Sequence, residues 1–286
     1  MTALAHCRVF LFTPGNRPDR FPKAAATGAD ALILDLEDAV SAAEKDSARA
    51  TLIAHFSGAF RKGLAPGQLC GLRVNNIHTQ AGLRDLEALA ASRVAPDFIF
   101  IPKVESAFEA RLYTHHLGAE QSNAPLVCMI ESARGLESAI DIANADARVQ
   151  ALALGGLDLA VDLGAEPSWE PLYAARARVV QAAAVAGIGA IDLPYASLDD
   201  IEGLAAQSKR VRAMGYTGKL AIHPKQLAPI VDAFSPGAEE VAEAEAIVAA
   251  FVAAKGNVCE YLGRMVEGPV VRAAERTLAR ARRGKS

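Results

Sequence analysis

Two acidic residues, Glu131 and Asp158, carry the strongest chemical signal in this sequence of 286 residues. Each follows a short apolar run that ends at a polar position. Two carboxylates held on neighbouring strands form an oxygen-only site. Such a site suits a hard cation such as Mg²⁺, which keeps several waters for a substrate to replace. The pattern also allows each acid to cap a helix or to pair with an arginine, as Glu131 could with Arg134.

A second acidic cluster, Asp35-Leu-Glu37-Asp38, ends another apolar run. Because side chains alternate along a strand, Asp35 and Glu37 are expected to point to the same side. Such carboxylates could accept hydrogen bonds from metal-bound waters. For Asp38 alone, the pattern favours a cap on the next helix at Ala39 over a catalytic role.

Positive groups follow two further apolar runs, at Arg73 and Lys103. An arginine fork can hold a substrate carboxylate by two contacts, or stabilise an enolate oxygen as charge develops there. A Schiff base at Lys103 is conceivable, but the surrounding acids favour a salt-bridged structural cation. His223, which precedes Pro224, could either position a loop or transfer protons.

Eight short apolar runs, separated by stretches of helical composition, must position these side chains. The runs cover residues 8–13, 31–35, 70–75, 97–101, 125–131, 151–156, 188–193 and 219–223. Strands that alternate with helices predict a parallel sheet, and eight units at this length fit a closed (β/α)₈ TIM barrel. The polar residues at the strand ends would then gather at one mouth of the barrel.

The pattern changes late in the chain, at the turn signal Ser235-Pro-Gly237. Beyond it lie an alanine-rich helical stretch, a Gly256-Asn257 break and a final helical stretch. We therefore expect a TIM-barrel catalytic domain over residues 1–234. Residues 235–286 are expected to form a C-terminal helical extension that serves as a lid or packs on a neighbouring subunit.

Composition argues against several classes of protein. No apolar run reaches the roughly 18 residues that a membrane span requires, and the first residues lack the pattern of a secretory leader. The net charge is −3, and the four cysteines show no CxxC pairing. These features predict a cytoplasmic protein with reduced cysteines and with neither a nucleic-acid nor a membrane partner.

The loop after the first expected strand contains a Pro-Gly-Asn turn and three basic residues, Arg17, Arg20 and Lys23. Backbone amides around Gly15 and a basic cluster at a helix start could take up phosphates. The loop lacks the GxxxxGK[ST] pattern of a nucleotide-binding P-loop. By itself it is a weak indication of a binding site.

Eight motifs, in order along nearly the whole chain, resemble the citrate lyase β-subunit-like branch of the HpcH/HpaI aldolase superfamily. This branch includes malyl-CoA, citramalyl-CoA and citryl lyases. The motifs are LFTPGNR (residues 11–17), DLEDAV (35–40), RVN (73–75), IPKVES (101–106), IESARG (130–135), GGLDL (155–159), AID (190–192) and AIHPKQ (221–226).

The resemblance implies roles for the residues that match these motifs. It implies that Glu131 and Asp158 bind Mg²⁺, with Glu37 and Asp38 in its outer shell. Substrate-binding positions are implied at Arg73, Glu37, Asp38 and Gly156. The loop from Phe12 to Lys23 is implied to bind the CoA-type carrier, through Thr13, Asn16, Arg20 and Lys23.

The resemblance also implies a catalytic acid near the C-terminus. The family carries an aspartate there, in a Val-Asp-x-Pro segment that often comes from a neighbouring subunit. This chain instead reads Met265-Val-Glu267-Gly-Pro269. We expect Glu267 to act with Arg73 in catalysis, although one more methylene moves its oxygens by about an ångström.

The activity implied by the resemblance is Mg²⁺-dependent cleavage of a 3-hydroxyacyl-CoA thioester of the malyl-, citramalyl- or citryl-CoA type. The products would be acetyl-CoA and a keto acid. Three alternatives remain: a citrate lyase β subunit that acts on a carrier-protein thioester, an acyl-CoA thioesterase, and a non-catalytic CoA-ester binding protein. The resemblance further implies a homotrimer or homohexamer.

Overall fold

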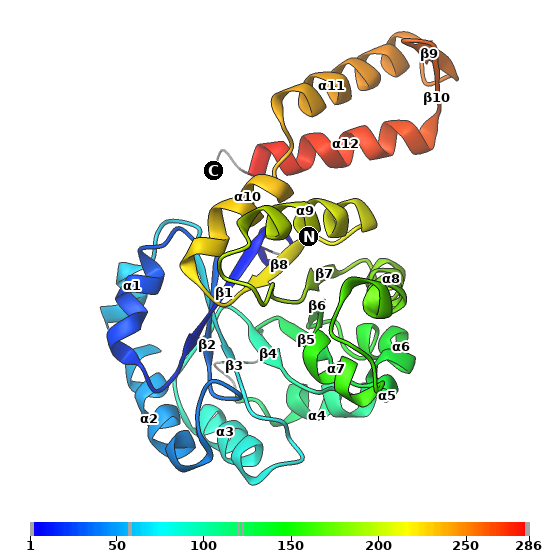
Figure 1. Cartoon of the computed structure of the whole chain (residues 1–286). Helices are drawn as coiled ribbons and strands as arrows, with labels where there is room; N and C mark the ends of the chain where they lie inside the picture. Colours follow the sequence, from blue (N-terminus) through cyan, green and yellow to red (C-terminus); the bar gives the residue numbers. More distant parts are fainter. Residues whose placement is uncertain (1–2, 57–58, 119–120, 122, 284–286) are drawn as a thin grey trace. The chain divides into compact units, whose positions relative to one another are not determined.

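The first part of the chain is a closed barrel of eight parallel strands in sequential order, β1 to β8, so the predicted (β/α)₈ fold is confirmed (Figure 1). The computed structural model describes residues 3–56, 59–118, 121 and 123–283. The strands are β1 (Val9–Pro14), β2 (Ala31–Asp35), β3 (Leu69–Arg73), β4 (Ile99–Ile101), β5 (Leu126–Ile130), β6 (Val149–Leu154), β7 (Gly189–Asp192) and β8 (Gly218–Ala221).

Apolar side chains fill the barrel interior, because each strand is a nearly continuous buried run. Phe98 packs edge-to-face against both Phe10 and Phe100, at ring-centroid distances of 6.1 and 6.4 Å. The predicted strand positions are confirmed, but several strands are shorter at their ends than expected. The run expected at 97–101, for example, forms a strand only over Ile99–Ile101, so its first two residues precede the strand.

Helices cover the outside of the barrel. They are α1 (Phe21–Ala25), α2 (Lys45–Phe56), α3 (Gln80–Ala91), α4 (Ala107–His116), α5 (Ala133–Glu137), α6 (Ala139–Ala143), α7 (Gly156–Asp162), α8 (Trp169–Ala186), α9 (Ile201–Met214) and α10 (Leu227–Phe234). Short 3₁₀ helices lie at η1 (Ala3–His6), η2 (Pro18–Arg20), η3 (Ala42–Glu44), η4 (Ala59–Gly63) and η6 (Pro224–Gln226).

Side-chain caps define where several of these helices begin. Thr79, Ser106 and Ser132 each accept a hydrogen bond from a backbone N–H three residues on. After β5 the chain forms two short helices, α5 and α6, which meet at Ser138. Helix α7 follows β6 directly, where the sequence predicted only the end of a strand.

A sealed ion cluster joins α8 to β7 and β8. Asp192 and Lys219 are partners in the register of the two strands, and both are fully buried. Lys219 Nζ lies 2.5 Å from one carboxylate oxygen of Asp192, and Arg176 Nε lies 3.0 Å from the other. Lys219 also donates to Gln207. We call Arg176, Asp192 and Lys219 the sealed cluster.

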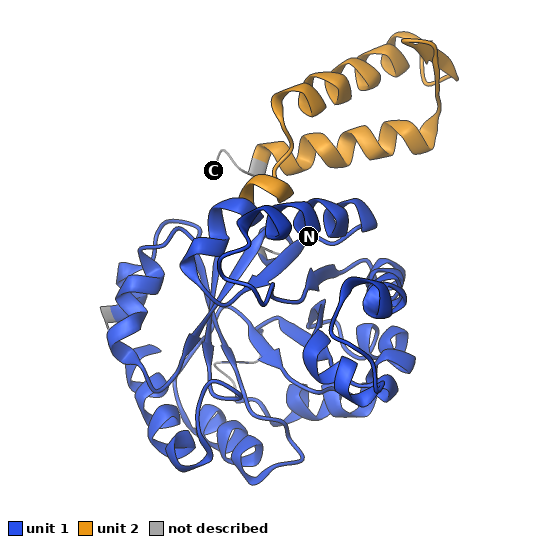
Figure 2. Cartoon of the chain, in the orientation of Figure 1, with its two compact units in different colours: residues 1–230 blue, residues 231–286 orange. Residues whose placement is uncertain are grey.

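The chain forms two compact units, residues 1–230 and residues 231–286 (Figure 2). The division falls within α10, and the turn at which we placed the domain boundary follows that helix directly. The second unit contains α11 (Ala238–Ala253), the antiparallel strands β9 (Cys259–Tyr261) and β10 (Arg264–Val266), and α12 (Gly268–Arg283). Helices α11 and α12 pack on each other. The assignment of this unit as a lid stays a prediction.

No helix within the described residues has both the length and the apolar character needed to cross a bilayer. The structure contains all four cysteines as thiols. Cys70 and Cys128 are fully buried in strands β3 and β5, as the sequence predicted.

Candidate active site

An ion pair between two neighbouring strands anchors the site at the carboxyl ends of the barrel strands. Arg73 and Asp35 are the last residues of β3 and β2, and they are partners in the strand register. The guanidinium contacts both carboxylate oxygens, with Nε–Oδ1 at 2.6 Å and Nη2–Oδ2 at 2.7 Å. It also lies over the ring of Phe12, 4.6 Å from the centroid. Arg73 is therefore a buried cation with a fixed orientation.

Glu37 and Asp38 extend this cluster. Arg73 Nη1 lies 2.9 Å from a Glu37 oxygen and 3.3 Å from an Asp38 oxygen. Burial raises the pKa of the Glu37 carboxyl, and the positive charges of Arg73 and Lys103 oppose that shift. Both Asp35 and Glu37 face Arg73, as the strand alternation predicted.

The capping role expected for Asp38 is wrong. The N–H of Ala39 donates to Asp35 instead, at 3.1 Å, and Asp35 also accepts the N–H of Glu37 at 2.9 Å. The chain turns after Asp38, and the next helical turn begins only at Ala42. The carboxylate of Asp38 consequently stays half-exposed beside Arg73.

Lys103 contributes both its backbone and its side chain. Its φ of 52° places it in the left-handed region, which non-glycine residues rarely adopt. In this conformation its N–H donates to Glu131 Oε2 at 2.8 Å, while its ammonium lies 2.8 Å from Glu37 Oε1. The same ammonium is 3.6 Å from Asp38 and 3.6 Å from Asp158.

These contacts determine the charge of Lys103. Burial alone would lower its pKa, but the hydrogen bond and the charge of Glu37 outweigh that effect and raise the pKa. Lys103 is thus a salt-bridged cation, as expected, and not the neutral amine that a Schiff base requires. Its partners are Glu37, Asp38 and Asp158.

Glu131 lies at the end of β5 and is only 5 % exposed. Burial raises the pKa of its carboxyl to about 8, and the negative charges of Glu37 and Asp158 add to that shift. Gly155 makes room for this carboxylate, because a Cβ at that position would lie 2.2 Å from Glu131 Oε1. Arg134 pairs with Glu105 at 3.7 Å, so the alternative pairing of Arg134 with Glu131 is wrong.

Asp158 lies in the first turn of α7, directly after β6. Its side chain is 49 % exposed, in contrast to the buried Glu131. The α7 N-cap is Gly155, so Asp158 is not the residue that caps this helix. Lys103 contacts Glu131 through its N–H and Asp158 through its ammonium, and we call these two acids, one buried and one half-exposed, the carboxylate pair.

The carboxylate pair fits a magnesium ion that keeps waters or substrate oxygens in its remaining positions. Among the residues that the structure describes, no three His, Cys, Asp or Glu side chains form a ready metal-binding group. A closed structural site is therefore not indicated. The space that Gly155 leaves for Glu131 shows that this carboxylate is held in place by the fold.

A cavity of about 650 Å³ adjoins the cluster on the side of β1 and β8. Phe12 and Ala39 line it, and Phe12 also contacts Arg73, so the cavity and the cluster share a wall. Three of the residues implied to bind CoA are in the lining: Thr13, Arg20 and Lys23.

Two other residues of the sequence analysis lie in or beside this cavity. Asn16 is not among the described lining residues, and its amide bonds Glu44 instead. His223 lines the cavity, and its Nδ1 accepts the N–H of Lys225 at 3.1 Å, which positions the following 3₁₀ turn. The loop-positioning role of His223 is thus visible directly.

Gly156 and Glu267 are the two remaining predicted residues. Gly156 begins α7, and a Cβ there would lie 2.6 Å from Leu193 Cδ2, so it permits close packing below the site. Glu267 belongs to the second unit, where it is half-buried and immediately precedes α12. Its backbone carbonyl accepts the N–H groups of Val270 and Val271. The predicted roles of both residues stay predictions.

Sequence reasoning missed two residues that build the site. Gly155 was part of a motif, but nothing in the sequence showed that a Glu131 oxygen needs its missing side chain. Lys45, at the start of α2, donates to the carbonyls of Leu36 and Glu37 at 2.7 and 2.6 Å. It thereby fixes the loop that carries the acidic cluster.

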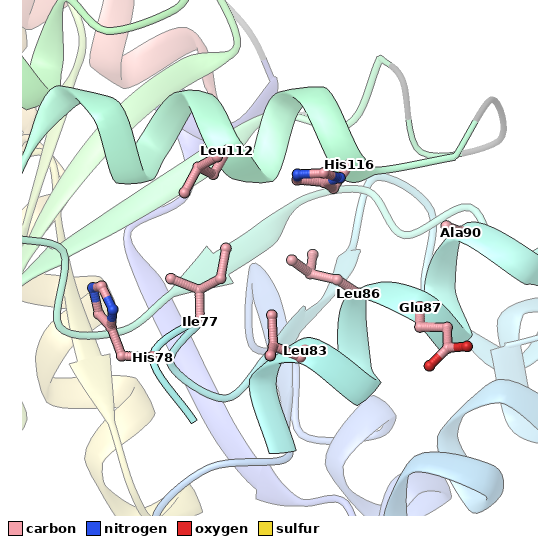
Figure 3. Close-up of a pocket in the computed structure, with 8 residues that line it drawn as sticks. All are labelled: Ile77, His78, Leu83, Leu86, Glu87, Ala90, Leu112 and His116. Atoms are coloured by element: carbon pink, nitrogen blue, oxygen red, sulfur yellow. The ribbon is translucent and has the colours of Figure 1, made fainter. Parts of the chain in front are cut away.

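A different cavity, of about 520 Å³, lies between α3 and α4 (Figure 3). Leu83, Leu86 and Leu112 give it an apolar wall, and His78 and His116 lie at its rim. Among its described lining residues, Glu87 supplies the one carboxylate, and there is no lysine or arginine. It is therefore not the candidate site.

Comparison with known proteins places this arrangement in a family. The family model described as HpcH/HpaI aldolase/citrate lyase matches residues 8–224. The chain belongs to this family. The predicted resemblance is thus confirmed over the barrel.

Two curated relatives and one solved structure illustrate the similarity. The chain is 33 % identical to the mitochondrial citramalyl-CoA lyase of Homo sapiens, over 96 % of this chain and 85 % of that protein. It is 35 % identical to the L-malyl-CoA/beta-methylmalyl-CoA lyase of Cereibacter sphaeroides, over 94 % and 92 %. It is 32 % identical to Mycobacterium tuberculosis CitE, with a TM-score of 0.81 over 96 % and 98 %. That structure is a complex with magnesium, acetoacetate and coenzyme A.

Proposed function

We propose that the chain is a magnesium-dependent carbon–carbon lyase that cleaves a 3-hydroxyacyl-CoA thioester to acetyl-CoA and a keto acid. The observation that carries the proposal is the carboxylate pair, Glu131 and Asp158, which both contact Lys103. Lys103 and the fixed cation Arg73 share the partner Glu37. The two relatives named as CoA-thioester lyases support it. Malyl-, citramalyl- and citryl-CoA are the candidate substrates.

Glu131 and Asp158 would hold the metal. When bound there, Mg²⁺ supplies positive charge for the hydroxyl and carboxylate oxygens of the substrate and lowers the pKa of that hydroxyl. In this proposal Glu37 and Asp38, which both contact the Lys103 ammonium, accept hydrogen bonds from waters or substrate near the metal. The magnesium in the related CitE structure supports this assignment.

Arg73 stabilises the negative charge that moves onto the thioester oxygen as the carbon–carbon bond breaks. Asp35 holds two of its nitrogens and Phe12 supports its flat face, so the guanidinium need not reorganise during the reaction. A donor that is already oriented is the more effective stabiliser of a developing oxyanion. Gly156 permits the start of α7 to pack closely against Leu193, and we place it next to the substrate.

The cavity beside β1 holds the CoA carrier in this proposal. Arg20 and Lys23 provide positive charge for the phosphates, and Thr13 provides a hydroxyl near the reacting end. Asn16 acts indirectly, because its side chain bonds Glu44 and so fixes the loop. Coenzyme A in the related CitE structure supports a carrier of this type.

Glu267 protonates the carbon of the thioester enolate and comes from a neighbouring subunit of a homotrimer or homohexamer. We expect Glu267→Gln to lower kcat by about a hundredfold and Glu267→Asp by less than tenfold, because positioned acids contribute about 10²–10⁴-fold.

Mixing experiments test whether Glu267 acts across subunits. Asp158→Ala and Glu267→Gln chains, each with little or no activity alone, should recover activity after they are dissociated and reassembled together. No recovery in mixed oligomers, verified by light scattering, would show that the acid acts within one chain or not at all.

The thiol state of the cysteines supports a cytoplasmic location for this assembly.

The second candidate is the β subunit of a citrate lyase that acts on a carrier-protein thioester. The family description, which includes citrate lyase, favours keeping it. A carrier protein would place its phosphopantetheine arm in the same cavity. Activity with a citryl carrier-protein thioester and none with free CoA esters would select this candidate.

One assay tests the proposed reaction. The protein is incubated with malyl-CoA, (S)-citramalyl-CoA and citryl-CoA, with Mg²⁺ or with EDTA, and keto acid and free thiol are detected separately. We expect keto acid only with Mg²⁺ and no matching release of thiol. Thiol without keto acid would instead indicate a thioesterase, and ligand-induced thermal stabilisation without turnover would indicate a binding protein.

A further inference from the structure

The ammonium of Lys103 lies among three carboxylates at the barrel mouth. It lies 2.8 Å from Glu37, 3.6 Å from Asp38 and 3.6 Å from Asp158. One of these three acids, Asp158, is a proposed metal ligand. The lysine is therefore a cation in contact with one of the two carboxylates that would hold the metal.

The backbone of Lys103 explains how the ammonium comes to lie there. Its left-handed conformation, with φ at 52°, is strained for a residue with a side chain. The strain lets one residue direct its N–H to Glu131 and its ammonium to Glu37 and Asp158. Lys103 thus contacts both proposed metal ligands, one through the backbone and one through the side chain.

We propose that Lys103 is an internal competitor of the divalent cation, which weakens metal binding to the substrate-free site. The inference rests on the proposed function and concerns the affinity of its metal site. A positive charge a few ångströms from a dication repels it, and an ion pair with Asp158 must loosen before that carboxylate turns to the metal. Metal is then held firmly only when the oxygens of a substrate add further ligands.

A purely structural salt bridge would have the opposite effect. If Lys103 only kept Glu37 and Asp158 in place, its removal would loosen the carboxylates and weaken metal binding. Competition instead requires that removal of the charge strengthens binding. The direction of the change in Mg²⁺ affinity therefore separates the two roles.

The experiment is a calorimetric titration of the full chain with MgCl₂ alone, without substrate. Lys103→Met removes the ammonium but keeps the N–H that Glu131 accepts, and we expect the dissociation constant for Mg²⁺ to fall by at least about tenfold. Lys103→Arg keeps the charge, so its constant should stay within about threefold of the wild-type value. Lys103→Gln serves as a second neutral variant if the methionine variant folds poorly.

A matched control is Lys209→Met, which removes one lysine charge from an exposed position on α9. Its Mg²⁺ affinity should equal that of the wild type. Unchanged or weaker binding in both neutral Lys103 variants, with measurable wild-type binding, would overturn the competitor role alone. If neither the wild type nor the neutral variants bind Mg²⁺, the proposed metal site fails and the competitor role fails with it.

Discussion

Two ion clusters in the barrel begin from the same local pattern but differ in what surrounds them. In each, an acid and a base are partners in the register of adjacent parallel strands: Asp35 with Arg73, and Asp192 with Lys219. The sealed cluster stops there, with one carboxylate between Arg176 and Lys219, and all three side chains are buried. It can only hold helix α8 against the strands.

The cluster at the mouth contains more acidic than basic side chains. Asp35, Glu37, Asp38, Glu131 and Asp158 surround two cations, Arg73 and Lys103. Asp158 remains half-exposed, so the excess negative charge is open to a ligand. A buried ion pair by itself therefore does not indicate a functional site. Unbalanced charge and an accessible carboxylate are the features that indicate a functional site.

The largest expected effect lies in the mouth cluster. We expect Asp158→Ala to reduce Mg²⁺-dependent keto-acid release to background, because it removes one of two proposed metal ligands. Its folding should be nearly unchanged, because the side chain is half-exposed. Activity and urea unfolding of the same sample provide the measurement. Asp199→Ala, which changes an acid with a 94 % exposed side chain, is the control.

Substitution of the acid in the sealed cluster should instead lower stability and leave activity intact. Asp192→Asn leaves Lys219 and Arg176 buried without their counter-charge, so we expect a loss of about 3–5 kcal/mol in the free energy of unfolding. Activity per folded molecule should persist. The midpoint of urea unfolding measures the loss, and Glu137→Gln, which breaks the exposed pair with Arg178, should cost less than about 1 kcal/mol.

A smaller effect, on the pH dependence of the free energy of unfolding, should come from Glu131. In EDTA, the folded protein keeps the Glu131 proton up to a pKa of about 8, whereas in the unfolded chain the pKa returns to about 4.5. Stability therefore falls as pH rises between these values, by at most about 1.4 kcal/mol per unit. The slope should appear in unfolding midpoints from pH 5 to 8 and vanish above pH 8. It should flatten in Glu131→Gln, and an equal slope in both proteins would disprove the assignment.

The barrel could be predicted because each strand is a local apolar run, and the ends of parallel strands must meet at one mouth. Glu131 and Arg73 were found for that reason. The position of Asp158 was less accurate, since β6 passes directly into α7 and the acid lies in a helical turn. Residue type and spacing do not determine the residue at which a strand ends and a helix begins.

Other features of the site depend on contacts between distant segments. The N–H of Ala39, which Asp38 was expected to cap, donates to Asp35 instead, because Arg73 on the next strand orients the Asp35 carboxylate. The clearance at Gly155 depends on Glu131 of a different strand, and the left-handed backbone of Lys103 has no sequence signature. Such non-local geometry could not be predicted from one sequence.

The most direct test of the central claim is the stoichiometry of divalent-metal binding, measured by electron paramagnetic resonance with Mn²⁺ as the probe and a keto acid present. We expect one Mn²⁺ site per wild-type chain. This site should be lost in both Glu131→Gln and Asp158→Asn, and it should be retained in Asp192→Asn. Full Mn²⁺ binding by folded Glu131→Gln and Asp158→Asn proteins would contradict it.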